Sequence, residues 1–174
     1  LIQNAQQIHI FPSFTAVSIG SINNNGQVVM ADFNGDSYDD VLTIDLSART
    51  VVFINNNNGG FSSSPVTIFA LPSSCLVDDV GTYLLALDWD NSGTVDFVLW
   101  CGQTSASPIL FAFSNSGSAS FAMQKNITAP GVGQVVLGDI ASTGSTDAII
   151  IFKNCEVRRV AFQSLTAIVT NTGQ

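Results

Sequence analysis

The chain has 174 residues, 46% of them apolar, so it can bury a substantial core. It carries a formal charge of −8 with only five Lys and Arg residues, which excludes the clustered basic surface of a nucleic-acid-binding protein. No apolar run approaches the ~18 residues that cross a bilayer, so we expect no membrane insertion.

The N-terminal segment, residues 1–27, is predicted to form one or two strands. Residues 10–19 resemble residues 161–170 near the other end of the chain. Both segments run on to a Gly-Gln pair, at 26–27 and at 173–174. Residues 1–27 would therefore be the last strand or two of a preceding or completing blade.

Three nine-residue windows then share one pattern, with Asp at positions 1 and 9. They are residues 32–40, 88–96 and 139–147, called here the first, second and third aspartate loops. They hold nine of the twelve aspartates, whereas the chain has a single glutamate, Glu156. The loops start 56 and then 51 residues apart, a spacing typical of stacked units such as propeller blades.

The composition of these loops predicts calcium sites. Ca²⁺ takes six to eight oxygen ligands, and alternate residues of a tight loop can point at one centre. Positions 1, 3, 5 and 9 would offer side chains and position 7 its backbone carbonyl. The ligands of the first loop would be Asp32, Asn34, Asp36, Tyr38 (carbonyl) and Asp40, and those of the second Asp88, Asp90, Ser92, Thr94 (carbonyl) and Asp96.

The third loop has a weaker ligand set, because Ala141 occupies position 3. It retains Asp139, Thr143, the Ser145 carbonyl and Asp147. Asp, Asn and Ser are also ordinary turn residues that bond to nearby backbone. That alternative fits the third loop better than the first two, where closely spaced carboxylates would repel one another without a cation.

A repeated apolar segment, residues 26–31, 83–87 and 133–138, precedes each aspartate loop and supplies the first strand of its unit. Each loop is followed by β-branched and aromatic segments separated by Gly, Asn and Ser turns, which predicts further strands. The expected strands are 41–45, 50–55 and 66–71, then 97–100, 109–113 and 121–125, then 148–152, 157–162 and 165–170. The predicted fold is all-β: a β-propeller-type array of about three four-stranded antiparallel blades. The blades would span 28–80, 81–131 and 132–174 of a single repeat domain, 1–174.

The first aspartate loop, continued through Val41 and Leu42, resembles the FG-GAP/VCBS-type repeat, whose blades build integrin α-subunit propellers and many secreted proteins. The Gly59-Gly60-Phe61 turn is similar to the turn late in such a unit. The resemblance implies a Ca²⁺-binding loop between the first two strands of a blade. The sequence departs from the pattern at Ser37, where Gly is usual, and at Ala141.

Three blades are fewer than the four to eight of closed propellers, so edges would be left unpaired. We therefore expect the array to be open, or completed by a neighbouring chain or by further blades of a longer chain. Contacts with a neighbouring chain, repeated head to tail, give rings or filaments.

Several features favour an extracellular or cell-surface setting. Cys75 and Cys101 can pair around the second blade, which leaves Cys155 over. Asn126 opens an N-glycosylation sequon. Millimolar extracellular Ca²⁺ can also fill sites of modest affinity.

Catalysis is not expected, because the chain has one histidine and no His/Cys cluster for zinc. The predicted function is a calcium-stabilised extracellular structural module that self-associates edge to edge. Two alternatives are an adhesion or receptor propeller segment that binds a protein or glycan, and an accessory propeller of a secreted enzyme.

Overall fold

The computed structural model describes the backbone of residues 3–4, 7–10, 15–18, 22, 24–76, 81–102, 108–128, 133–138, 147–152, 157–161 and 167–168. Side chains are described for residues 22, 27–76, 81–102 and 108–128. All regular structure in these residues is β, which confirms the predicted class. They include no helix of the length and apolarity that a membrane span needs.

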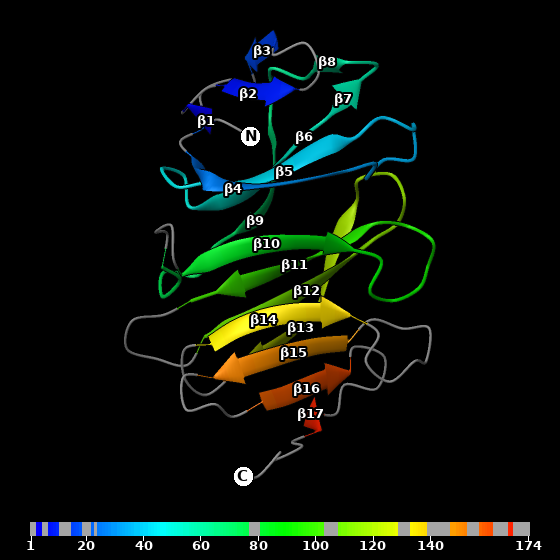
Figure 1. Cartoon of the computed structure of the whole chain (residues 1–174). Coiled ribbons are helices and arrows are strands. Elements are labelled where there is room, and N and C mark those ends of the chain that lie inside the picture. Colours follow the sequence, from blue (N-terminus) through cyan, green and yellow to red (C-terminus); the bar gives the residue numbers. More distant parts are fainter. Residues whose placement is uncertain are drawn as a thin grey trace.

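The strands form separate antiparallel sheets that stack along the molecule (Figure 1). A three-stranded sheet consists of β1 (Gln3–Asn4), β2 (Gln7–Ile10) and β3 (Thr15–Ser18). Three four-stranded sheets follow, each with its strands in chain order. They have the strand number and antiparallel order expected of open propeller-like blades.

The first of these sheets, blade 1, contains β4 (Asn24–Ala31), β5 (Asp40–Asp45), β6 (Thr50–Ile54) and β9 (Val66–Ala70). A hairpin of β7 (Asn56–Asn57) and β8 (Gly60–Phe61) lies between β6 and β9 in the chain. Blade 2 contains β10 (Thr82–Leu87), β11 (Asp96–Cys101), β12 (Ile109–Asn115) and β13 (Phe121–Thr128). Blade 3 contains β14 (Gly133–Gly138), β15 (Asp147–Phe152), β16 (Val157–Ala161) and β17 (Ala167–Ile168).

The second strands of blades 1 and 2 are buried on both faces. In β11 every residue is buried, and its alternate side chains enter different clusters. Phe97 and Leu99 face blade 1, whereas Val98 and Trp100 belong to a cluster on the opposite face of the sheet. This period of two is what a strand between two packed layers requires.

Blades 1 and 2 share one apolar core that is rich in phenylalanine. Phe97 stacks on Phe113 with ring centroids 4.3 Å apart, and Phe121 lies edge-on to Phe97 at 5.2 Å and to Phe33 at 5.6 Å. Aromatic pairs of this kind add roughly 0.5–1.5 kcal/mol beyond the area that they bury. Strand β4 lies beside β10, so the first two aspartate loops leave the sheets at the same end (Figure 1).

The connection from blade 1 to blade 2 is fixed at several points. A disulfide joins Cys75 to Cys101 at the end of β11, with a Cα–Cα distance of 5.2 Å. The guanidinium of Arg49 donates to the carbonyls of Pro72 and Cys75, at 3.0 and 2.9 Å. Gly102 approaches the connection so closely that a Cβ there would lie 2.1 Å from the carbonyl oxygen of Gly81.

Candidate metal centre

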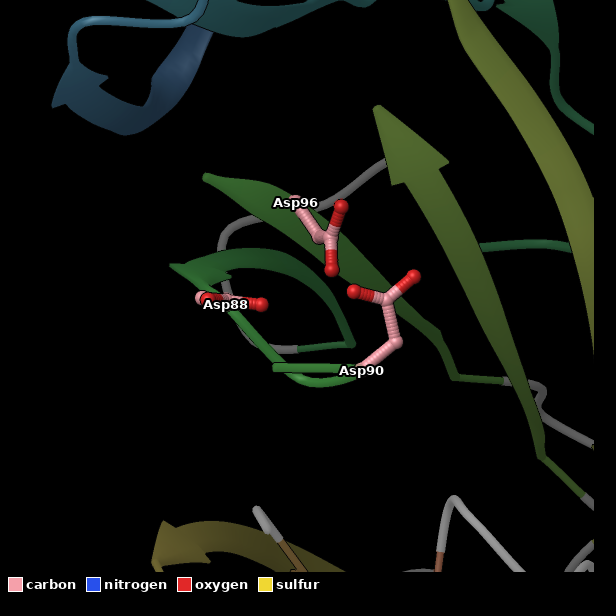
Figure 2. Close-up of side chains that lie close together, drawn as sticks. All are labelled: Asp88, Asp90 and Asp96. Atoms are coloured by element: carbon pink, nitrogen blue, oxygen red, sulfur yellow. The ribbon is translucent and has the colours of Figure 1, made fainter. Parts of the chain in front are cut away.

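The second aspartate loop runs from the end of β10 to the start of β11 and brings three carboxylates together. Oxygens of Asp88, Asp90 and Asp96 all lie within 4.8 Å of one another (Figure 2). Among the residues whose side chains are described, they are the one group of three acidic, His or Cys side chains so close together. An all-oxygen set of this kind suits a hard divalent cation.

Asp96, at position 9, is the buried member of the group, with 0% of its surface exposed. Its carboxylate accepts the backbone N–H of Asn115 at 2.7 Å and that of Trp89 at 3.2 Å. Burial raises the pKa of Asp96 to about 6, and the neighbouring charge of Asp90 adds to the rise. A buried carboxylate beside another carboxylate is costly in its ionised form unless a cation offsets the charge.

Asp88, at position 1, organises the loop backbone. Its two oxygens accept the N–H groups of Ser92 and Gly93, at 3.0 and 2.8 Å. Asp90 accepts the Ser92 N–H at 3.0 Å, and the Ser92 hydroxyl lies 2.8 Å from that of Thr94. The three carboxylates predicted as ligands of this loop therefore lie close together.

The first aspartate loop repeats this scaffold in blade 1. Asp32 accepts the N–H groups of Gly35 at 2.7 Å and Ser37 at 2.8 Å. Asp40 is fully buried, and it accepts the N–H groups of Asn56 at 2.8 Å and Phe33 at 3.2 Å. Burial raises the pKa of Asp40, and the charges of Asp36 and Asp32 raise it further.

The middle of the first loop differs, since its carboxylates do not form a close group of three. Position 3 is Asn34, whose amide donates to Asp36 at 3.0 Å and to the side-chain oxygen of Asn55 at 2.5 Å. Asp36 also accepts the Tyr38 N–H at 2.9 Å. The residue at position 3 of this loop is thus an amide that donates to one of the loop's own carboxylates.

Two asparagines that the sequence analysis missed complete the loops. Asn56 and Asn115 each donate a backbone N–H to the closing aspartate of their own blade. Each side chain also accepts an N–H from a nearby glycine, Gly59 or Gly117, at 2.8 or 3.1 Å. The sequence carried a signal for them, because each is an Asn at the end of the third strand of a blade or just after it, and each precedes a glycine by two or three places.

The other predicted site residues lie elsewhere. Asn126 is exposed on β13, the last strand of blade 2. In the third aspartate loop, residues 139–146 lie outside the described part of the chain, as does Cys155, and Asp147 begins β15.

Part of the chain is similar to a known repeat family. The family model of the FG-GAP-like repeat matches residues 32–99. The match begins at the first residue of the first aspartate loop and extends through the second loop into β11. No curated protein sequence matches the chain.

Proposed function

We propose, from the premise that residues 32–99 carry an FG-GAP-like repeat, that this protein is a calcium-stabilised extracellular structural module. FG-GAP-like repeats form propeller-type modules that are generally non-catalytic and occur in extracellular and surface proteins. The blades would associate edge to edge into a larger assembly. No catalytic role is proposed for the chain.

The convergence of Asp88, Asp90 and Asp96 is the observation that carries the proposal. Ca²⁺ there would be held by these carboxylates, with Ser92 and the Thr94 carbonyl as the further predicted ligands. Bound Ca²⁺ supplies positive charge that offsets the burial of Asp96 and its repulsion by Asp90. Because the loop connects β10 to β11, the cation would also fix the first two strands of blade 2 relative to each other.

The extracellular setting is supported by the disulfide between Cys75 and Cys101, since disulfides persist in oxidising compartments. Millimolar extracellular Ca²⁺ would fill a site of modest affinity. Asn126 has an exposed side chain that a glycan could occupy.

Self-association is supported by the outer strands of the blades. β9 and β13 each end the strand order of their sheet. Val66 on β9 is 56% exposed and Met123 on β13 is 48% exposed. A strand edge that presents apolar side chains is a ready surface for pairing with another chain.

The deciding experiment is the mass of the native particle by light scattering, with Ca²⁺ and then with excess chelator. We expect multiples of the 18.3 kDa chain that shrink or unfold on chelation. Asp90→Asn should reproduce the effect of chelator, because it removes one of the three convergent charges. Val66→Lys and Met123→Lys should reduce the mass while leaving Ca²⁺ binding intact. A folded monomer that ignores chelator would overturn the proposal.

A further inference from the structure

The turn between β12 and β13 lies between the two aspartate loops (Figure 1). On one side, a Cβ added to Gly35 of the first loop would lie 3.3 Å from the carbonyl oxygen of Gly117 in this turn. On the other side, a Cβ added to Gly117 would lie 3.0 Å from the Thr94 methyl group of the second loop. The turn is therefore in close contact with both loops.

Asn115, which precedes this turn, is bonded to both loops. Its backbone N–H donates to Asp96 at 2.7 Å, and its carbonyl accepts the Thr94 hydroxyl at 2.8 Å. Its side-chain amide donates to the carbonyl of Phe33 in the first loop at 2.7 Å. Asn115 itself is buried, with 5% of its surface exposed, so water competes weakly for these bonds.

Phe33 carries the connection to the closing carboxylate of blade 1. Its carbonyl accepts a second bond from blade 2, the Ala119 N–H at 3.0 Å, and its own N–H donates to Asp40 at 3.2 Å. An unbroken path thus runs from Asp96 through Asn115 and Phe33 to Asp40. Both ends of the path are the buried aspartates at position 9 of their loops.

Asn56 provides an internal comparison, because it occupies the equivalent place in blade 1. Its amide donates to the Asp39 carbonyl at 3.0 Å, as that of Asn115 donates to Val95 at 2.9 Å. The hydrogen bonds described for Asn56 all stay within blade 1, whereas Asn115 adds the bond to the neighbouring blade. The difference between the two residues is therefore the contact with Phe33.

We infer that Asn115 couples the two aspartate loops, so that a cation in the second loop raises the affinity of the first loop for another. The inference rests on the proposed function, since it requires Ca²⁺ at the second loop, and it adds a second cation bound at the first loop. A cation there restrains Asp96 and Thr94, which hold the backbone of Asn115. Its amide then restrains the Phe33 peptide, which bonds to Asp40. Asn115 acts as a positioning residue and is not itself a ligand.

The test is a Ca²⁺ titration by calorimetry of the full chain and of loop-specific variants. Asp90→Asn removes a predicted ligand of the second loop. We expect the Ca²⁺ affinity of the first loop to fall at least about five-fold as a result, which is the lower end of measured couplings. In an Asn115→Ala background the same substitution should leave the first loop unchanged. Asn56→Ala is the matched control, because it removes the equivalent bonds within blade 1. In that background Asp90→Asn should still lower the Ca²⁺ affinity of the first loop.

A second measurement needs no change at Asn115. In an Asp36→Asn protein, where the first loop is impaired, Ca²⁺ at the second loop should slow hydrogen exchange of the Gly35 and Ser37 amides. Unchanged exchange with Ca²⁺ bound, or independent affinities of the two loops in the titration, would overturn the coupling alone. No Ca²⁺ binding at the second loop would overturn both the coupling and the proposed function.

Discussion

The first and second aspartate loops share one sequence pattern but hold their centres differently. At position 3 the first loop has Asn34, whose amide donates to Asp36 and Asn55. The second loop has Asp90, which cannot donate when ionised and instead lies close to Asp88 and Asp96. The Asn34 amide therefore donates to one carboxylate of the first loop, whereas we propose that a cation offsets the converging charges of the second.

The two loops agree at positions 1 and 9, which have a structural role. Asp32 and Asp88 each accept N–H groups from their own loop. Asp40 and Asp96 each accept one N–H from position 2 and one from the Asn at or just after the end of the third strand. The repeated aspartates are thus needed for the turn itself, whether or not a metal is bound.

The largest expected effect on stability comes from removing the aspartate at position 9 of either loop. Asp96→Ala and Asp40→Ala should each lower the free energy of unfolding by about 2–4 kcal/mol in chelator, because each leaves two buried N–H groups unpaired. Urea denaturation measures both losses, which should agree within about 1 kcal/mol since the bonds are equivalent. Asp39→Ala is the control, because Asp39 is exposed and should change stability by less than about 0.5 kcal/mol. Losses below that level at Asp96 would contradict the scaffold role.

Exchanging the residues at position 3 tests the difference between the loops. Asp90→Asn should weaken Ca²⁺ binding at the second loop about tenfold or more, equivalent to ~1.4 kcal/mol. Asn34→Asp should raise the Ca²⁺ affinity of the first loop and lower its stability in chelator, because it replaces a donor with a further carboxylate. Calorimetric titration measures both effects.

Asp39→Asn is the control for the exchange, because it removes the same charge from an exposed residue that is not a predicted ligand. It should change the Ca²⁺ affinity of the second loop only slightly. An equal loss of affinity for Asp39→Asn and Asp90→Asn would show that general charge, and not position 3, decides binding.

The strands were predictable from the sequence, whereas the contacts between blades were not. The expected strand at 41–45 corresponds to β5 at Asp40–Asp45, and that at 97–100 to β11 at Asp96–Cys101, because burial on both faces gives largely apolar runs. The bond from Asn115 to Phe33 joins residues 82 positions apart. No local pattern reports such a pairing.

The aspartate loops were predictable in position but not in detail. The nine-residue spacing located both turns, yet it also suggested equal convergence in the two loops. Position 3 carries a carboxylate in the second loop and an amide in the first, and the amide of Asn34 bonds to Asp36 and Asn55. Asn55, which accepts the hydrogen bond of the Asn34 amide, lies outside the loop. The sequence of the loop alone therefore could not predict this bond.

Position 6 of the second loop should show a smaller, purely conformational effect. Gly93 has φ of 86° and nothing within 4 Å of an added Cβ, so Gly93→Ala tests the backbone alone. We expect a loss of about 1–2 kcal/mol, the cost of a left-handed conformation for a residue with a side chain. Gly60→Ala is the control, since Gly60 is not among the glycines with positive φ. Equal losses for the two variants in urea denaturation would contradict this account.

The same position in the first loop should give the smallest effect, with the opposite sign. Ser37 has φ of 71°, so it already bears the strain that Gly93 avoids. Ser37→Gly should raise the free energy of unfolding by less than about 1 kcal/mol, because the relief of strain is partly offset by the greater freedom of glycine in the unfolded chain. Ser37→Ala keeps a Cβ and should give no gain. If Ser37→Gly destabilised the protein, the serine would have a role in the first loop beyond its backbone conformation, and the two loops would differ at position 6 as well as at position 3.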